Sequence, residues 1–240
     1  MPQSNSHTNS SSLYKHIAKW ITELDNDWDK PFIISGIQHG FSIIDKLTTD
    51  HVAMAESANH KSVTLPIIKD KVEQRIVEEI QEGNYAIVSN KPTIVSGLCA
   101  VPKPDGDVRV VHDLSQPPTK SLNDYASKDV CKYQTIQDAL SIIKPNYFMA
   151  KVDLKWAYRS VCIRPEHTNL TGLKWTFTGM SQPTYLIDKR LPFGARKSPS
   201  IFNRLTQAVR RMMSRKGFNV ITYLDDFLVI GTSFENCLIA

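Results

Sequence analysis

The stretch from Val220 to Gly231 constrains the fold more than any other part of the sequence, because two apolar, β-prone runs meet there at a pair of adjacent carboxylates. Val, Ile, Thr, Tyr and Phe favour a pleated, half-buried setting, so the runs predict the two strands of a tight hairpin. Asp225 and Asp226 would then lie at its tip. An ordinary acidic turn is the plainer interpretation, since Asp is common in turns for local hydrogen-bonding reasons. Paired carboxylates at a strand end are also suited to binding a metal ion.

The composition is that of a globular protein. With 240 residues and 41% hydrophobic content, the chain can form one large domain or two modest ones. It has no run of about 18 apolar residues, as a membrane span requires, and its N-terminus is polar where a secretory signal would be apolar. The sequence therefore predicts an intracellular protein of the cytoplasm or nucleus, without a membrane partner and with a disordered tail over residues 1–12. Its four cysteines are too widely spaced for a zinc site or a disulfide framework.

The charge distribution indicates a polyanionic substrate. The net charge is +5, but the segment from Lys151 to Lys216 contains 14 Lys and Arg against three acidic residues. Lys and Arg neutralise phosphates and release counterions, so a basic segment beside paired acids suits a nucleic acid. A solvated basic face is the alternative that charge alone leaves open.

A hairpin is predicted between Leu98 and Asp113, because two alternating runs flank the Asp-Gly pair at 105–106. Lys103 and Arg109 would lie near its tip. There the planar fork of Arg and the point charge of Lys could bind a triphosphate. Charges that merely keep an exposed hairpin soluble are the alternative.

Other elements are predicted from apolar spacing and from helix caps. Residues 13–66 are interpreted as an N-terminal extension, helical at first and then irregular. A strand over residues 147–152 leads directly into Asp153, so a carboxylate leaves the end of a buried strand. Helices are expected over residues 68–81, after Thr135 and from Ser198 to about Lys216, and further strands over 158–163 and 176–191.

A capping box at Thr232–Glu235 predicts a further helix that begins close to Ala240. We therefore expect the chain to be a fragment whose C-terminal portion is missing.

Taken together and in this order, the motifs resemble those of the reverse transcriptase family. Three palm motifs and a fingers hairpin carry the resemblance, and they lie at Asp153–Tyr158 (DLKWAY), at Leu191–Gly194 (LPFG) followed by Ser198-Pro199 and Phe202, at Tyr223–Asp226 (YLDD) and at Val101–Asp113. The resemblance covers about residues 65–235. The Phe-Gly pair is similar to the form found in long-terminal-repeat (gypsy-like) and tyrosine-recombinase retrotransposons, and the upstream segment favours the latter, DIRS-like group.

The resemblance implies an α+β fold that comprises the fingers and palm of a right-hand polymerase. An antiparallel palm sheet would be backed by helices, and the thumb would be missing. The fingers would span residues 67–134. The palm would span residues 135–240 and would be truncated after the catalytic hairpin.

The same resemblance implies an RNA-directed DNA polymerase that transfers deoxynucleotides to a primer 3′ hydroxyl. Asp153, Asp225 and Asp226 would be the catalytic residues and the ligands of two Mg²⁺ ions, for which Mn²⁺ could substitute. The implied partners are an RNA or DNA template with its primer, deoxynucleoside triphosphates, and the missing thumb and RNase H region of the same polyprotein.

The remaining site residues would bind the nucleotide. Lys103 and Arg109 would hold the β- and γ-phosphates, and Tyr158 would act as a steric gate against the ribose 2′ hydroxyl. Phe193 and Gly194 would line the nucleotide and template pocket.

Two other interpretations compete with this one. Another palm polymerase, such as an RNA-dependent RNA polymerase, shares the paired acids but commonly has Gly before them and no aromatic gate, so Leu224 and Tyr158 argue against it. The second alternative is a catalytically incompetent remnant of a retroelement that at most binds nucleic acid.

Overall fold

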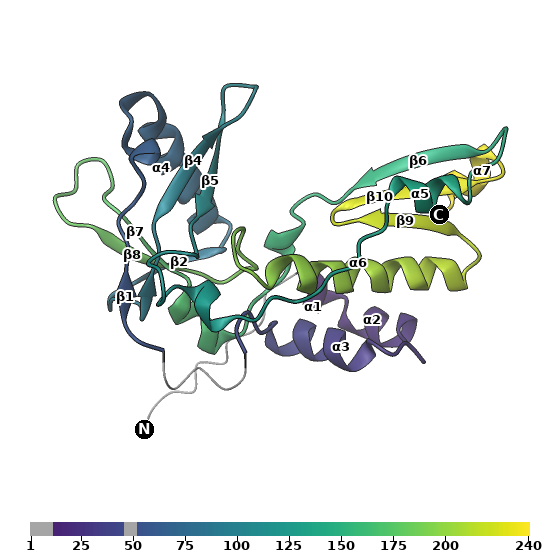
Figure 1. Cartoon of the computed structure of the whole chain (residues 1–240), viewed down its shortest axis with the longest axis horizontal. Helices are drawn as coiled ribbons and strands as arrows, with labels where there is room; N and C mark the ends of the chain where they lie inside the picture. Colours follow the sequence, from purple (N-terminus) through teal and green to yellow (C-terminus); the bar gives the residue numbers. More distant parts are fainter. Residues whose placement is uncertain (1–11, 46–51) are drawn as a thin grey trace.

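The computed structural model describes residues 12–45 and 52–240 and places two β-rich regions side by side (Figure 1). Helix α6 (Ser198–Arg215) extends from the junction of these regions under the right-hand one, and the N-terminal helices lie beneath it (Figure 1). The left-hand region is called the fingers and the right-hand region the palm. The predicted tail over residues 1–12 lies outside the described residues except for Ser12, the first residue of α1 (Ser12–Lys15).

The N-terminal extension folds as α1, α2 (Ile17–Glu23) and α3 (Lys30–His39), which confirms its predicted helical start. Pro31 lies in the first turn of α3, where its missing N–H costs no helical hydrogen bond. Ile33 and Ile37 of α3 are fully or almost fully buried in the same hydrophobic cluster as Leu205 of α6. Burying one such side chain stabilises a fold by about 1.5–3 kcal/mol. The extension is therefore part of the main hydrophobic core.

Strands from two distant parts of the sequence form the fingers sheet. They are β1 (Ala55–Glu56), β2 (Tyr85–Val88), β3 (Ile94–Val95), β7 (Gly172–Trp175) and β8 (Thr184–Asp188). Among the described residues their order is β1-β3-β7-β8-β2. Helix α4 (Pro66–Gln81) confirms the helix predicted over 68–81, and its Val72 and Ile76 are buried in one cluster with Leu173 and Leu186 of this sheet.

The position of β7 and β8 differs from the predicted domain division. Both strands belong to the sequence range 135–240 that was expected to form the palm, yet they pair with β3 and β2 of the fingers. Of the strands expected over 176–191, β8 is present, whereas β7 precedes that range. Position 135 is therefore no boundary between the two sheets.

The fingers hairpin, β4 (Leu98–Pro102) and β5 (Val108–His112), confirms the hairpin predicted around the Asp-Gly pair. Gly106 has φ = +80°, in the left-handed region that Gly adopts readily. The N–H of Lys103 donates to the carbonyl of Asp107 at 2.8 Å and closes the turn. In the strand register, Arg109 lies opposite Val101.

The palm sheet consists of β6 (Phe148–Asp153), β10 (Asp226–Gly231) and β9 (Asn219–Tyr223) in that spatial order, with antiparallel neighbours. Alternate residues of a strand face opposite sides of a sheet. Accordingly, Ile221 and Ile230 cluster with Ala139 of α5 (Ile136–Leu140), while Val220 clusters with Val209 of α6. The predicted antiparallel sheet backed by helices is confirmed.

Helix caps explain where the palm helices begin. The predicted capping box of Thr135 and Asp138 is present at α5, and Ser233 accepts a hydrogen bond from the backbone N–H of Asn236 at the start of α7 (Phe234–Leu238). Ser198, predicted as the cap of α6, instead donates to the carbonyl of Pro192 at 2.7 Å and is the first helical residue. Of the helices in the described ranges, none has the length and apolar character needed to cross a membrane.

Candidate active site

The paired acids lie at the turn between β9 and β10. Tyr223 pairs with Asp226, so Leu224 and Asp225 form the turn and Asp226 is the first residue of β10. The tip thus lies one residue earlier than predicted. Leu224 has φ = +52°, a left-handed conformation that costs a non-Gly residue about 1–2 kcal/mol. Strain of this size is often found at functional sites.

Strand β6 brings the third acid to the same corner of the palm sheet. Asp153 lies opposite Asp226 in the antiparallel register, and the N–H of Leu154 donates to the carbonyl of Asp225 at 3.1 Å. Residues opposite each other in such a pair project from the same face. The structure therefore brings together the three carboxylates that the sequence singled out.

Asp153, Asp225 and Asp226 are together called the acidic corner. A lysine of β6 neutralises part of its charge. Nζ of Lys151 lies 2.9 Å from Oδ1 of Asp226. The pKa of Lys151 is above its usual value, first because its ammonium donates to Asp226 and further because the charges of Asp153 and Asp225 favour the protonated form. All three carboxylates thus act electrostatically on one cation.

The ligand chemistry of this corner fits a hard divalent cation. Carboxylate oxygens are the ligands that Mg²⁺ prefers. Within residues 12–45 and 52–240, no group of three His, Cys, Asp or Glu side chains is arranged to hold a metal ion as it stands. Asp226 already binds a cation, however, in the form of the Lys151 ammonium. The corner thus offers carboxylate oxygens of the kind that bind Mg²⁺, and one of these oxygens is paired with the Lys151 ammonium.

Tyr158 lies in a short 3₁₀ helix (Tyr158–Ser160), so the strand predicted over 158–163 is wrong at its start. Its ring stacks on Phe193, with centroids 4.9 Å apart, and packs at a tilt against Phe202 at 5.0 Å. Tyr158 is only 9% exposed whereas Phe193 is 48% exposed, so Phe193 forms the outer layer of this aromatic stack. Burial raises the pKa of Tyr158, whose hydroxyl therefore stays protonated.

Gly194 lies against the end of the fingers hairpin. It has φ = +105°, and a Cβ at this position would lie 2.4 Å from the carbonyl oxygen of His112, the last residue of β5. Its own carbonyl accepts a hydrogen bond from Nδ2 of Asn123 at 2.9 Å. The close backbone approach predicted for Gly194 is present, and its partner is the end of the fingers hairpin.

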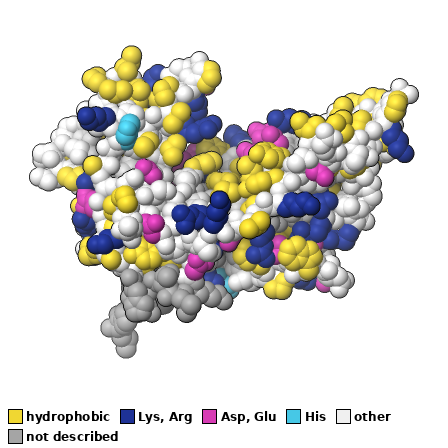
Figure 2. All heavy atoms as spheres, in the orientation of Figure 1, with side chains coloured by type: hydrophobic (Ala, Val, Ile, Leu, Met, Phe, Trp, Pro, Cys, Tyr) yellow, Lys and Arg dark blue, Asp and Glu magenta, His cyan; other side chains and the backbone are white. Residues whose placement is uncertain are grey.

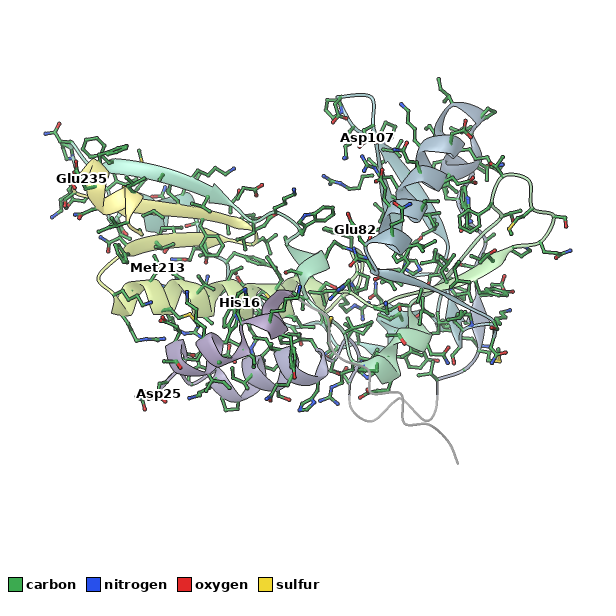
Figure 3. All side chains as sticks on the ribbon, turned by 180° about the vertical axis from the view of Figure 1, so that it is seen from behind. His16, Asp25, Glu82, Asp107, Met213 and Glu235 are labelled. Carbon is green, nitrogen blue, oxygen red and sulfur yellow. The ribbon has the colours of Figure 1, made fainter. Side chains whose placement is uncertain are left out.

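The two predicted phosphate-binding cations lie on the fingers hairpin, away from the acidic corner. Arg109 is exposed on β5, whereas Nζ of Lys103 binds Asp107 at 3.0 Å. Arg75 of α4 donates to the same carboxylate, and together these cations hold the pKa of Asp107 below its usual range. Figure 3 shows Asp107 near the hairpin tip, across a gap from the palm sheet. The surface is hollowed between fingers and palm, with acidic and hydrophobic side chains on the floor (Figure 2).

Much of the basic charge of α6 is neutralised within the chain. Arg211 and Arg215 donate to Asp27, and Arg204 donates to Asp29 through Nε at 3.1 Å. These five residues are called the extension clamp. The carboxylates of Asp27 and Asp29 are each 1% exposed. Part of the basic charge counted between Lys151 and Lys216 is therefore paired within the chain.

The aromatic residues of the extension reinforce the clamp. The guanidinium of Arg204 lies 3.3 Å from the ring centroid of Phe32, and that of Arg211 lies 4.7 Å from the ring of Trp28. Cations placed over aromatic faces gain about 0.5–2 kcal/mol. Asp27 and Asp29 were not predicted as functional residues, because their partners lie 175 to 188 positions away in the sequence.

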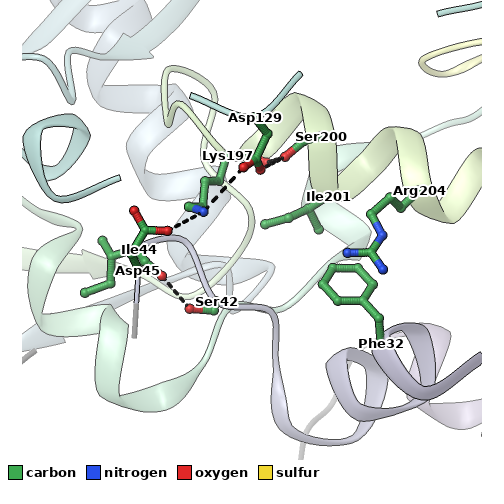
Figure 4. A pocket seen from close by; sticks show the side chains of 9 residues that line it. All are labelled: Phe32, Ser42, Ile44, Asp45, Asp129, Lys197, Ser200, Ile201 and Arg204. Carbon is green, nitrogen blue, oxygen red and sulfur yellow. Dashed lines mark hydrogen bonds and ion pairs between the residues drawn. The ribbon is translucent and has the colours of Figure 1, made fainter. Parts of the chain in front are cut away.

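A pocket of about 260 Å³ adjoins the clamp (Figure 4). Lys197 lies in it between Asp45 at 2.6 Å and Asp129 at 3.6 Å, and Ser200 donates to Asp129 at 2.6 Å. Among the described residues that line it, none is a predicted site residue. The pocket belongs to the seam between extension and palm rather than to the acidic corner.

A buried arginine joins the segment that carries Tyr158 to the fingers. Arg159 donates to Asp188 of β8 at 2.8 Å and to Glu79 of α4 at 2.7 Å, and its side chain is 9% exposed. Its guanidinium also lies 5.4 Å from the ring centroid of Tyr85 on β2. Arg159 was not predicted as a site residue. Its position directly after Tyr158, the predicted gate, was a signal that could have identified it.

The α+β fold carries three carboxylates at one corner of the palm sheet, and comparison with known proteins shows the family to which the chain belongs. Residues 101–240, more than half of the chain, match the family described as reverse transcriptase (RNA-dependent DNA polymerase). The chain belongs to the reverse transcriptase family.

Similar proteins occur among retrotransposon polyproteins. The transposon Tf2-3 and Tf2-4 polyproteins of Schizosaccharomyces pombe are each 25% identical to this chain over 158 residues, which are 65% of the chain and 11% of the polyprotein. The chain thus spans about a tenth of the length of these curated relatives. The DIRS-like subtype stays a prediction.

Solved structures share the fold. The native prototype foamy virus protease-reverse transcriptase superimposes with a TM-score of 0.62 at 22% identity, over 83% of this chain and 24% of that one. A foamy viral protease-reverse transcriptase in complex with double-stranded DNA gives a TM-score of 0.58 at 18% identity, over 98% and 41%.

Proposed function

We propose that this chain is the fingers and palm portion of an RNA-directed DNA polymerase that adds deoxynucleotides to a primer 3′ hydroxyl. The observation that carries the proposal is the strand register that sets Asp153 opposite Asp226, with Asp225 in the adjoining turn. Residues at the ends of paired strands have backbones that the strand pairing holds in place, and a catalytic site requires such fixed positions. Membership of the reverse transcriptase family supports the reaction class.

Asp153, Asp225 and Asp226 would hold the metal ions of this reaction. When bound, two Mg²⁺ ions, or Mn²⁺ in their place, activate the attacking hydroxyl and offset the charge that develops on the phosphates. The chain contributes anionic oxygen ligands on one face of the palm sheet. β6 and β10 fix the backbones of Asp153 and Asp226, and rotation of their side chains would gather the carboxylates.

Lys103 and Arg109 would bind the triphosphate of the incoming nucleotide. Both belong to the fingers hairpin, which faces the palm across the hollow (Figures 1 and 2). Arg109 is exposed and can form a bidentate contact with phosphate oxygens. Lys103 would first have to leave the carboxylate of Asp107.

We predict that Arg109→Ala raises the KM for deoxynucleotides by about tenfold or more. A hydrogen bond to a charged group contributes about 1.5–3 kcal/mol, and about 1.4 kcal/mol corresponds to one factor of ten. Steady-state primer extension at varied nucleotide concentration measures this. Lys120→Ala, which removes an exposed cation from the loop after β5, is the control and should leave KM unchanged. An unaltered KM in Arg109→Ala would contradict a role in nucleotide binding and leave Arg109 as a surface charge that aids solubility.

Tyr158 would select deoxyribose. A ring beneath the sugar collides with a ribose 2′ hydroxyl, and Tyr158 is held in place by Phe193 on one side and Phe202 on another. Phe193, as the outer ring of this stack, and Gly194 would line the nucleotide and template pocket.

We predict that Tyr158→Val raises the ratio of ribonucleotide to deoxynucleotide incorporation by at least about tenfold, because the smaller side chain removes the collision. Single-nucleotide extension with each sugar gives the ratio. Tyr147→Val is the matched control, since it makes the same replacement in the cluster of Ala139, Ile221 and Ile230, away from the Tyr158 stack. It should lower stability and leave the ratio unchanged. Equal ratios in Tyr158→Val and the parent chain would remove Tyr158 from the gate role.

The proposed partners are a primer-template duplex and the remainder of a retroelement polyprotein. Phosphate contacts position such a duplex without reading its sequence. A foamy viral protease-reverse transcriptase of similar fold was solved in complex with double-stranded DNA. This supports the binding of a duplex in the hollow between fingers and palm. The curated relatives are far longer than this chain, which is consistent with further segments such as a thumb and an RNase H region. We place this activity inside the cell.

Primer extension tests the proposed function. The full chain would be given an RNA template, a DNA primer, Mg²⁺ and deoxynucleotides, and the expected product is primer-length DNA extended in a template-directed way. Chelation of the metal should stop the reaction. Extension with ribonucleotides alone would favour another palm polymerase. Absence of extension together with retained duplex binding would favour a catalytically incompetent remnant.

A further inference from the structure

Lys151 occupies a distinctive place on the palm sheet. It precedes Asp153 by two positions on β6, so the two side chains project from the same face of the strand. Opposite them on β10 lie Leu228 and Asp226. The Lys151 ammonium reaches diagonally across to Oδ1 of Asp226.

The pair contributes little to folding stability. The side chains of Lys151 and Asp226 are 67% and 44% exposed, and exposed ion pairs are worth about 0–1 kcal/mol. The neighbouring cation behaves differently, since Nζ of Lys155 lies 5.7 Å from the ring centroid of Trp156. Lys151 therefore has a specific position on the acidic face that stability of the fold does not explain.

The same carboxylate oxygen cannot serve an ammonium and a divalent ion at once without cost. A metal ligand oxygen lies about 2.0–2.1 Å from Mg²⁺. An ammonium held 2.9 Å from that oxygen would then be close to the metal ion, and like charges repel strongly at such separations. A metal ion bound through Oδ1 of Asp226 therefore requires the Lys151 side chain to leave that oxygen.

We propose that Lys151 is an internal counter-cation that competes with divalent metal ions for Asp226 and so sets the metal affinity of the acidic corner. The inference rests on the proposed function, in which Asp226 is a metal ligand. In the metal-free chain, Lys151 neutralises Asp226 and reduces the repulsion that Asp153 and Asp225 would otherwise exert on it. When metal binds, the ammonium is displaced from Oδ1.

Binding of Mn²⁺ to the full chain, measured as the loss of the electron paramagnetic resonance signal of free Mn²⁺, tests the proposal without an activity assay. Lys151→Gln should lower the Kd for Mn²⁺ by about fivefold, the factor expected for loss of one exposed competing cation. Lys151→Arg retains the charge and should keep the Kd of the parent chain within about twofold. Because Lys151 is exposed, both variants are expected to fold.

Two further variants separate direct competition from a general effect of charge. Lys155→Gln removes a cation at the same sequence distance from Asp153, and it should change the Kd by less than about twofold. In an Asp226→Asn background, the addition of Lys151→Gln should have no further effect, since the competition requires the carboxylate.

The outcomes are distinct. Equal Kd values for the parent chain and Lys151→Gln would overturn the inference and leave the metal site intact. A fivefold change in both Lys151→Gln and Lys155→Gln would overturn it in favour of bulk charge. Absence of saturable Mn²⁺ binding in every variant would overturn both the inference and the metal site of the proposed function.

Discussion

Replacing Asp225 by Asn is expected to lower primer extension by at least about 100-fold while leaving primer-template binding unchanged. The amide keeps the size of the carboxylate and loses the negative charge that a divalent ion requires. A loss of this size matches the removal of one preorganised group that stabilises charge in a transition state. Single-turnover extension measures the rate, and fluorescence anisotropy of a labelled duplex measures binding.

Glu235→Gln is the control for this experiment. Glu235 lies at the far end of the palm sheet from the β9–β10 turn, so neutralising it tests the effect of charge loss away from the acidic corner (Figure 3). It should retain the parent rate within about twofold. Full extension by Asp225→Asn would exclude Asp225 as a metal ligand, and loss of duplex binding would indicate a folding defect instead.

Asp27→Asn is expected to lower the free energy of unfolding by about 2 kcal/mol at pH 7. Asp27 accepts hydrogen bonds from Arg211 at 2.8 and 2.9 Å and from Arg215 at 3.2 Å, and its carboxylate is 1% exposed. Hydrogen bonds to a charged group contribute about 1.5–3 kcal/mol, and Arg211 keeps Asp29 as a second partner at 3.8 Å, so the loss is smaller than for a fully buried pair. Urea denaturation monitored by circular dichroism gives the difference.

The same variant should change how stability depends on pH. The hydrogen bond from Arg211 holds the pKa of Asp27 well below its usual range, and the contacts to the N–H of Asp29 and to Arg215 act in the same direction. A lowered pKa in the folded state contributes stability above the unfolded value of about 3.9, and this contribution is lost as the pH falls further. The difference between the parent chain and Asp27→Asn should therefore be full at pH 7 and shrink below about pH 4.

Asp25→Asn is a matched control two positions away. Asp25 is 73% exposed and pairs with Lys30, and Figure 3 shows it at the outer end of the N-terminal helices. Its replacement should cost less than about 1 kcal/mol. Equal losses in the two variants would contradict a specific role for the extension clamp.

Local chemistry made much of this fold predictable. The Asp-Gly turn of the fingers hairpin, the capping box at Thr135, the N-cap at Ser233 and the apolar stripe of α4 each depend on residues a few positions apart. Such contacts are encoded in short windows of sequence. The strand that ends at Asp153 was predictable for the same reason.

Contacts between distant segments were not predictable from single windows. The partner of Asp27 lies 184 positions away, and β7 joins the fingers although it follows β6 in sequence. The union of Asp153 with Asp226 was expected through the family resemblance, since strand pairing at this separation has no local signal. Tyr158 resembled a strand residue by composition, but it lies in a 3₁₀ turn and packs against Phe193 and Phe202, which are distant in the sequence.

The return of the chain to the fingers sheet through β7 and β8 makes the two regions inseparable by a single cut. The polypeptide builds β6 of the palm, goes back to complete the fingers, and then re-enters the palm through α6. Proteolytic cleavage of one connecting segment therefore leaves the fingers and the palm joined by the others. A chimera that exchanges the fingers between related proteins needs junctions on both sides of residues 172–188. Any swing of one region against the other must bend all of these connectors together, which favours a small, concerted hinge motion over free rotation.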